Sequence, residues 1–230
     1  MPTEFAKCSA DPCYFINKHV LVFHPAKGLI PLHLHPFQSM IIRDYQDNDR
    51  NIVLKARQLG LSTITAAYIV WLLVFSKGEM VTIVSVWPAA THTMIKKILQ
   101  RIPRGFCEIA KSGLTSLVLA NGSKLKVQNS FLRKIEPGSL IVIDEAAFVD
   151  LNDRVLDGHR CIAFSSPGTD PESWFCKTYQ QAELGIGDFK PSVYKWFVHP
   201  DRSPSWFAQQ QKKYLTKRAI AAEFNCILPK

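Results

Sequence analysis

Apolar and polar positions follow two different periods along this chain. Short, continuous apolar runs, the pattern of strands buried on both faces of a parallel sheet, occupy residues 51–55, 81–86, 140–143 and 160–165, and a weaker run predicts a last strand at 193–198. Apolar residues at helical spacing lie before, between and after these runs, at 35–46, 62–75, 88–101, 204–215 and 217–224. Strands that alternate with helices predict an α/β fold, with a mostly parallel sheet and helices on both faces.

One pair of strands breaks this alternation. Residues 115–119 and 124–128 flank Asn121-Gly122, a dipeptide that favours a tight hairpin because both residue types tolerate positive φ. No repeat or long flexible linker divides the 230 residues, so the sequence predicts a single domain, 1–230. Within it we expect a lead-in at 1–50, a core at 51–200 and closing helices at 201–230.

The segment from Lys55 to Thr63 has the composition and context of a phosphate-binding loop. It follows a predicted strand and precedes a predicted helix, so backbone N–H groups and a helix N-terminus can face an anion. Gly60 permits close approach, and Ser62 holds the position whose hydroxyl ligates magnesium in such loops. The usual GxxxxGK[ST] pattern is altered, since Lys55 replaces its first glycine and Leu61 its lysine. The predicted nucleotide-binding residues of the loop are Lys55, Arg57, Gln58, Leu59, Gly60, Leu61, Ser62 and Thr63.

Two adjacent carboxylates, Asp144 and Glu145, end a predicted buried strand. Open parallel sheets bind their ligands at the carboxyl ends of the strands, and Lys55 and Ser165 fall at such ends as well. We expect Asp144 to hold Mg²⁺ with Ser62, and Glu145 to orient and deprotonate an attacking water. Together with the altered loop, these acids predict a P-loop NTPase core of the ASCE type that binds and hydrolyses ATP.

The charge of the chain points to a polyanionic partner. The formal net charge is +9 at pH 7 and the sequence pI is about 9.3. Between Thr91 and Pro137, nine basic residues stand against two acidic ones, a net of +7. Contacts with a phosphate backbone are expected in this region from Lys96, Lys97, Arg101, Lys124 and Lys126.

Several other classes of protein are disfavoured. No apolar run reaches the ~20 residues that a bilayer requires, and the first residues lack the apolar core of a signal peptide, which predicts a cytosolic protein. The six cysteines are scattered without a CxxC pair, so free thiols are expected. His33 and His35 form a pair without a second pair of ligands, which argues against zinc.

These segments, in this order, resemble the ATPase domain of the large terminase subunit of tailed bacteriophages, the DNA-packaging motor. The resemblance runs through most of the chain, and its most specific segments are 57–63 (RQLGLST) and 144–148 (DEAAF). Supporting segments lie at 25–31, 36–38, 165–168 and 222–226. The resemblance implies ATP and Mg²⁺ as cofactors and the translocation of double-stranded DNA into a capsid.

Several residue roles follow from the resemblance alone. It implies that Gln38 contacts adenine, that Arg57 acts on the phosphates, and that Ser165 and Ser166 couple hydrolysis to movement. Arg133 corresponds to a sensing or trans-activating arginine, although the Arg-Gly pair usual in the family is absent here.

The resemblance also implies partners and location. The expected partners are a portal protein and a small terminase subunit, with a homo-oligomeric ring on assembly, a monomer in isolation and no membrane. The expected location is the host cytoplasm, at the procapsid. Family subunits normally continue into an RNase H-like nuclease, and no such domain is expected within these residues.

Two other functions remain open. Leu61 at the usual lysine position favours a degenerate, non-catalytic module that binds nucleotide or DNA. Glu145 argues against this module, because a site that only binds needs no acid to activate water. Some members of the terminase family carry the loop lysine at the start of the loop, which fits Lys55. A helicase-like ATPase shares the acidic strand and the upstream glutamine, but such helicases usually need two nucleotide-binding cores, and the sequence contains one.

Overall fold

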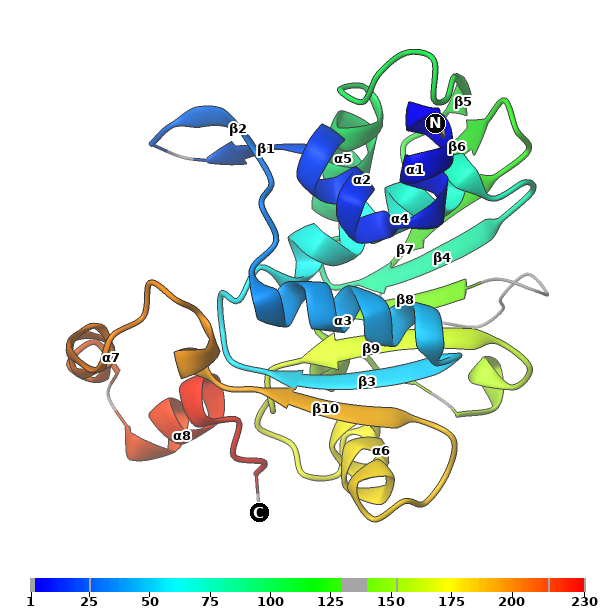
Figure 1. Ribbon diagram of the computed structural model, residues 1–230. Helices are drawn as coiled ribbons and strands as arrows, with labels where there is room; N and C mark the ends of the chain where they lie inside the picture. Colours follow the sequence, from blue (N-terminus) through cyan, green and yellow to red (C-terminus); the bar gives the residue numbers. More distant parts are fainter. Residues whose placement is uncertain (1–2, 25, 130–139, 152, 215, 230) are drawn as a thin grey trace.

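The computed structural model describes residues 3–24, 26–129, 140–151, 153–214 and 216–229. Within these residues, eight strands form one mixed sheet (Figure 1). From one edge to the other, its strands are β10 (Lys190–Tyr194), β3 (Arg50–Lys55), β9 (Arg160–Ser165), β8 (Leu140–Asp144), β4 (Met80–Ser85), β7 (Lys124–Gln128), β6 (Ser116–Leu119) and β5 (Ile109–Ser112). The strands from β10 to β7 pair in parallel, and β6 and β5 continue the sheet antiparallel. The predicted, mostly parallel α/β fold is confirmed.

The strand order decides which side chains meet. β9 lies between β3, which leads into the predicted phosphate loop, and β8, which ends in the two acids. The register aligns Leu54 with Ser165 and Phe164 with Asp144, so the carboxyl ends of the three strands are level. An extra strand between the loop strand and the acidic strand is the arrangement that the ASCE prediction requires.

Helices cover both faces of the sheet, because right-handed crossovers that run in opposite directions along the strand order place their helices on opposite faces. One face carries α2 (Pro12–His19), α3 (Pro36–Asp47), α4 (Leu61–Phe75) and α5 (Pro88–Leu99), with α1 (Glu4–Ala10) packed on α2. α6 (Trp174–Glu183) packs against β3 and β10 on the other face. α7 (Pro204–Gln211) and α8 (Lys217–Asn225) lie beyond the carboxyl ends of β3 and β10, and the β1–β2 ribbon (Leu21–His24 and Gly28–Pro31) projects away from the sheet (Figure 1).

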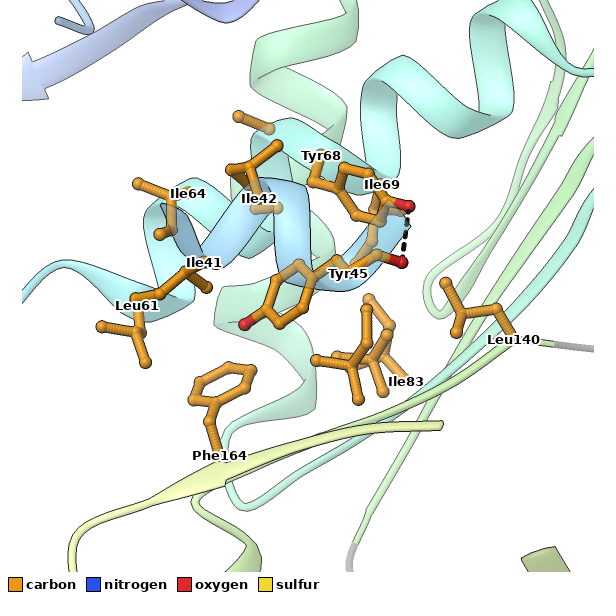
Figure 2. Packing of buried hydrophobic residues seen from close by; sticks show 14 of the residues in the cluster. Ile41, Ile42, Tyr45, Leu61, Ile64, Tyr68, Ile69, Ile83, Leu140 and Phe164 are labelled. Atoms are coloured by element: carbon orange, nitrogen blue, oxygen red, sulfur yellow. Dashed lines mark hydrogen bonds between the residues drawn. The ribbon is translucent and has the colours of Figure 1, made fainter. Parts of the chain in front are cut away.

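Helix α4 is the centre of the hydrophobic core. Its 15 residues are apolar on nearly every side, and most are buried. Figure 2 shows Ile64 of α4 beside Ile41 of α3, with Phe164 of β9 close to the start of α4. Tyr68 donates a hydrogen bond to the carbonyl of Tyr45 at 3.3 Å. Burial of one large apolar side chain contributes about 1.5–3 kcal/mol, so core packing fixes the helix that begins at the predicted loop.

Two predicted boundaries near the C-terminus are wrong. The pattern predicts a strand at 193–198, whereas β10 ends at Tyr194 and a 3₁₀ turn follows at Trp196–Val198. β10 is an edge strand that contains Pro191 and leaves most of its side chains at least partly exposed, so it lacks the continuous apolar run of an inner strand. The helix predicted at 204–215 ends at Gln211.

The hydrophobic pattern misses α1, α2, β1, β2, β5 and α6. Most of these elements are short, and α6 has a mixed composition whose start is set by a side-chain cap: Ser173 Oγ accepts a hydrogen bond from Cys176 N–H at 3.3 Å. Two 3₁₀ helices, Ala146–Phe148 and Asp153–Leu156, fill the short interval between β8 and β9. None of the described helices is long and apolar enough to cross a membrane.

The predicted hairpin is confirmed, and it also holds the end of α4. β6 and β7 pair antiparallel around Asn121-Gly122, with Gly122 at a φ of 87°. The Asn121 side-chain amide donates to the carbonyls of Leu73, Val74 and Ser76 at 2.8, 3.1 and 3.0 Å. The last carbonyls of a helix have no partner within the helix, so Asn121 caps the end of α4.

Replacing Asn121 by Asp tests this cap. The aspartate keeps the oxygen that accepts from Ser123 N–H at 3.0 Å but loses both donors and adds a negative charge at the C-terminal end of a helix dipole. We expect Asn121→Asp to lower the free energy of unfolding by about 1–3 kcal/mol, measured by denaturant titration. An unchanged midpoint would show that water replaces the amide without loss.

Candidate active site

The carboxyl ends of three adjacent strands bring the predicted polar side chains together. β3 ends at Lys55, β9 at Ser165 and β8 at Asp144, which Glu145 follows directly. The Oε1 atom of Glu145 lies 2.8 Å from Lys55 Nζ. Its Oε2 atom accepts a hydrogen bond from Ser165 Oγ at 3.4 Å. Residues that lie 90 and 20 positions apart in the chain thus meet at one carboxylate.

The Lys55–Glu145 ion pair is largely withdrawn from solvent, with 6% of the lysine side chain and 33% of the glutamate side chain exposed. A buried ammonium group needs a counter-charge, and Glu145 supplies it. Glu145 itself has a left-handed backbone, with φ 56° and ψ 50°, which costs on the order of 1–3 kcal/mol for a residue with a side chain. The 3₁₀ turn that follows and the hydrogen bond from Ala147 N–H to Ser165 Oγ (3.1 Å) hold it in this conformation.

Ser62 and Asp144 form a second polar pair at the start of α4. Ser62 Oγ donates to Asp144 Oδ1 at 3.1 Å. Burial, and after it the charge of Glu145, raises the pKa of Asp144 to about 6, against the lowering effects of the Ser62 hydrogen bond and of Lys55. Mg²⁺ prefers oxygen ligands, and a carboxylate that is costly to ionise without a cation fits such a ligand. The pair predicted to hold magnesium is therefore formed.

Two residues of the loop between β3 and α4 have a left-handed backbone, Gln58 at φ 59° and Gly60 at φ 78°. A Cβ atom on Gly60 would lie 3.0 Å from Gln38 Nε2. Both the φ angle and the close approach therefore favour glycine at position 60, as the phosphate-loop pattern predicts.

This loop leaves a run of backbone donors unused. The N–H groups of Ala56 and Arg57 donate to the carbonyls of Tyr194 and Glu223, each at 2.8 Å. The N–H groups of residues 58–62 have no hydrogen-bond acceptor in the part of the chain that the structure describes. Successive free N–H groups at the N-terminus of a helix form an anion-binding site.

The carbonyls of the same loop are held by side chains from outside it. Gln38 Nε2, from α3, donates to the carbonyl of Leu59 at 3.0 Å. Arg202 Nη2, from the segment before α7, donates to the carbonyls of Arg57 and Gln58 at 3.0 and 2.6 Å. The sequence analysis assigns no role to Arg202, because no motif surrounds it and 144 positions separate it from Gln58.

Gln38 and Arg57 lie at the loop, in contacts that the resemblance does not anticipate. The buried Gln38 side chain accepts from His35 N–H at 3.0 Å while it donates to the loop. Arg57 is exposed, and its Nη1 atom lies 3.9 Å from Glu223 Oε2 on α8. The adenine contact of Gln38 and the phosphate contact of Arg57 remain predictions.

The other predicted residues of the site are accounted for as follows. Leu61 is buried at the start of α4, Thr63 is half-buried in the same first turn, and Ser166 is buried next to Ser165. Arg133 lies outside the described residues.

The predicted DNA-binding residues form two groups on opposite faces of the sheet. Lys124 and Lys126 alternate with the buried Leu125 and Val127 along β7 and border an open groove of about 250 Å³ on the sheet surface. The second group, Lys96, Lys97 and Arg101, lies on α5 and two residues beyond its end, and α5 packs on the covered face of β4 and β7. The positive charge that the sequence concentrates is therefore divided by the sheet.

Solved structures share this fold, although no family model matches the chain. The large terminase ATPase domain of Thermus phage P74-26 aligns with a TM-score of 0.67 and 17% identity over 84% of this chain and 93% of that domain. The HK97 bacteriophage large terminase aligns with a TM-score of 0.72 and 15% identity over 95% of this chain and 54% of its own length.

A large terminase from a thermophilic bacteriophage, in complex with ATP-gamma-S, aligns with a TM-score of 0.64 and 11% identity over 85% of this chain and 53% of that protein. This chain thus spans about half the length of that terminase and of the HK97 terminase. At these identities the likeness establishes the fold, and the resemblance predicted from the sequence is confirmed at that level.

The raised pKa of Asp144 makes stability depend on pH. Its value of about 6 exceeds the ordinary 3.8, so the folded state binds more protons than the unfolded state between these values. Stability therefore falls as pH rises from about 4 to about 6 and stays reduced above this range. We expect Asp144→Asn to remove this loss, which raises the unfolding temperature by several degrees at pH 7.5, without magnesium, and much less at pH 4.5.

Thermal unfolding of both proteins at the two pH values measures the difference. The asparagine side chain of the variant keeps an oxygen that accepts from Ser62, so packing and hydrogen bonding change little. An equal effect of the substitution at both pH values would contradict the ionisation argument.

Proposed function

We propose that this chain is an ATP-hydrolysing motor domain that translocates double-stranded DNA into a viral capsid. The observation that carries the proposal is the meeting of Lys55, Glu145 and Ser165 beside the Ser62–Asp144 pair, next to a loop with unused N–H groups. This set provides a cation for phosphates, a carboxylate for water and oxygen ligands for a metal, which are the groups that nucleoside triphosphate hydrolysis needs. It occurs within the fold of terminase ATPase domains.

ATP binds, in this proposal, with its phosphates on the loop between β3 and α4. The N–H groups of residues 58–62 and the N-terminus of α4 stabilise the phosphate charge. Lys55 adds a full positive charge at the edge of the loop, where its ammonium already contacts Glu145 at 2.8 Å. Mg²⁺, with Ser62 and Asp144 as ligands, supplies further neutralisation of phosphate charge when bound.

Glu145 is the proposed general base. Its carboxylate takes a proton from water as the water oxygen bonds to the γ-phosphorus and the bond from this phosphorus to the β–γ bridging oxygen breaks, which yields ADP and phosphate. One-third of the side chain is exposed, so water reaches it. The left-handed backbone and the contacts with Lys55 and Ser165 restrict the carboxylate to one position, which favours a fixed geometry for proton transfer.

Ser165 and Ser166 are the proposed coupling residues. Ser165 Oγ donates to the carboxylate of Glu145 and accepts from the N–H of Ala147. A shift of Glu145 after phosphate release therefore disturbs both hydrogen bonds of Ser165. The loop after β9 continues to Gly168, where a Cβ atom would lie 3.0 Å from Ala147 Cβ. This close packing ties the loop after β9 to the turn that follows Glu145.

The proposal extends to an assembly. Double-stranded DNA, a portal protein and a small terminase subunit are the proposed partners, with copies of this chain in a ring in the host cytoplasm. The net charge of +9 supports a DNA partner. A neighbouring copy in such a ring would supply a trans-acting arginine, for which Arg133 is the candidate.

A non-catalytic nucleotide-binding or DNA-binding module is the alternative that Leu61 favours. The contact between Lys55 and Glu145 weighs against it, because it gives the site a cation despite the loss of the usual lysine. The helicase-like alternative has no support of its own in the described residues. They contain one phosphate loop, between β3 and α4, and one strand that ends in adjacent acids, β8, whereas such helicases usually need two nucleotide-binding cores.

Replacement of Glu145 by Gln tests the catalytic assignment. The variant keeps the side-chain shape but has no base, so we expect phosphate release with Mg²⁺ and duplex DNA to fall at least about 100-fold. Asp150→Asn, which neutralises an exposed acid five positions beyond Glu145, is the matched control for loss of one carboxylate.

Replacement of Lys55 by Ala tests the displaced lysine. The variant removes the cation from the site, and we expect it to weaken ATP binding by about tenfold or more.

The outcomes separate the alternatives. Hydrolysis by Glu145→Gln at the wild-type rate would refute the assignment of the base. If the wild-type chain binds ATP but does not hydrolyse it with duplex DNA present, the result favours the non-catalytic module or a missing partner in trans.

Charge reversal on each face of the sheet identifies the DNA-binding surface. We expect Lys124→Glu with Lys126→Glu to weaken duplex DNA binding and to reduce the slope of log affinity against log salt by about 2, since each lost phosphate contact lowers it by about 0.9. Lys96→Glu with Lys97→Glu is the matched pair on the opposite face and should change the slope less, because Lys96 is half-buried. Unchanged affinity and slope in the Lys124/Lys126 double variant would remove β7 from the DNA-binding surface.

A further inference from the structure

One guanidinium group holds the carbonyl side of the phosphate loop. Arg202 Nη2 donates to the carbonyls of Arg57 and Gln58 at 3.0 and 2.6 Å. The residue is only 9% exposed, and its guanidinium lies over the ring of Trp206 with 4.5 Å between Cζ and the ring centroid. The charge is therefore fixed on one side by an aromatic face and on the other by the loop.

The geometry of the peptide bond gives this contact a consequence for the site. Within one peptide unit the N–H and the C=O point in opposite directions, so a loop that directs N–H groups towards an anion directs carbonyls away from it. Carbonyls that are turned towards the protein interior need hydrogen-bond donors. The carbonyls of Arg57 and Gln58 belong to the peptide units whose N–H groups are those of Gln58 and Leu59, the first two unused donors of the loop.

We propose that Arg202 is a positioning residue of the nucleotide site: by binding two consecutive loop carbonyls, it orients the N–H groups of Gln58 and Leu59 towards the phosphates of ATP. The inference rests on the proposed function, since the loop must bind ATP. Arg202 acts through the loop backbone, on the side of the loop opposite to these N–H groups.

The surroundings of Arg202 make its burial costly, so its bonds to the loop are the contacts that offset this cost. Its Nη1 atom is buried and has no hydrogen-bond partner among the described residues, and burial lowers the pKa of the guanidinium. A buried cation with an unsatisfied nitrogen is costly. An apolar side chain on Trp206 would avoid both costs but would leave the carbonyls of Arg57 and Gln58 without these donors. What the guanidinium provides in return is the pair of bonds to the loop.

The aromatic cluster of the C-terminal segment keeps Arg202 in place. The ring of Trp206 packs with those of Trp196 and Phe224 at centroid distances of 6.2 and 5.9 Å. Glu223, next to Phe224, accepts from Arg57 N–H at 2.8 Å. The C-terminal segment thus contacts the loop through its backbone on one side and through Arg202 on the other, while Gln38 of α3 holds the next carbonyl, that of Leu59.

A lysine cannot reproduce this contact. A guanidinium presents several donors in a rigid plane and stacks on an aromatic ring, whereas an ammonium is a compact, strongly hydrated charge on a flexible stem. Arg202→Lys is therefore expected to retain the charge while it loosens the loop. Arg202→Met keeps an apolar stem over Trp206 and removes both loop bonds.

The test compares ATP binding with stability in the full chain. Calorimetric titration with Mg·ATP gives the affinity, and thermal unfolding without nucleotide gives the stability. We expect Arg202→Met to weaken ATP binding at least about tenfold, as loss of charge-assisted hydrogen bonds implies, and Arg202→Lys to weaken it by about three- to tenfold. Arg218→Met, which removes an exposed arginine of α8, is the matched control and should change the affinity less than about twofold.

Chemical rescue distinguishes positioning from a general loss of fold. Arg202→Ala leaves space over Trp206, and we expect millimolar guanidinium chloride to recover part of its ATP affinity, whereas sodium chloride at the same concentration does not. Wild-type affinity in both Arg202→Met and Arg202→Lys would overturn the inference. If the Met variant does not fold, wild-type affinity in Arg202→Lys without guanidinium rescue of the Ala variant would overturn it as well.

Failure of the proposed function is distinguishable from failure of this inference. No ATP binding by the wild-type chain would overturn both. If the wild-type chain binds ATP and Arg202→Met and Arg202→Lys bind it equally tightly, this inference alone is overturned, and the proposed function stands.

Discussion

The buried contact between Lys55 and Glu145 is the interaction on which the candidate site depends. The registers of β3, β9 and β8 bring the carboxyl ends of the three strands level, so Lys55 and Glu145 meet across the end of β9. Each charge makes the burial of the other tolerable, and Ser165 on the middle strand binds the remaining oxygen of the carboxylate. The sheet topology, rather than any local motif, thus brings a lysine, a glutamate and a serine from three separate segments into contact.

A second constraint acts on the loop beside this contact. Free N–H groups on one side of the loop require that the carbonyls on the other side find donors, and the chain draws these donors from two distant parts, Gln38 of α3 and Arg202 near the C-terminus. The segments before and after the central core therefore have a shared physical role. They complete the backbone hydrogen bonding of a loop that could not satisfy its own carbonyls while it keeps its N–H groups free for an anion.

The sequence predicts the inner strands and the residues at their ends, because strands buried on both faces have continuous apolar runs and because parallel strands present their carboxyl ends together. It misplaces the bounds of β10, an edge strand that contains Pro191, and it misses α6, whose start depends on a cap at Ser173. Arg202 also escapes prediction, since its partners are backbone carbonyls, which leave no trace in the pattern of side chains. What the sequence cannot supply is the set of side-chain contacts to backbone across long separations.

Leu61 shows why the altered loop is compatible with chemistry. It is buried at the first position of α4, in the same cluster of buried hydrophobic residues as Phe164 (Figure 2). A lysine at this position would lose this apolar burial and would add a second cation to the loop. The cation comes instead from the end of β3, where hydrogen bonds to β10 and β9 on both sides hold the backbone. Compared with the usual GxxxxGK[ST] pattern, this chain therefore carries its loop lysine at the start of the loop, at Lys55, and not at position 61. Glu145, directly after β8, binds the ammonium group of Lys55 there.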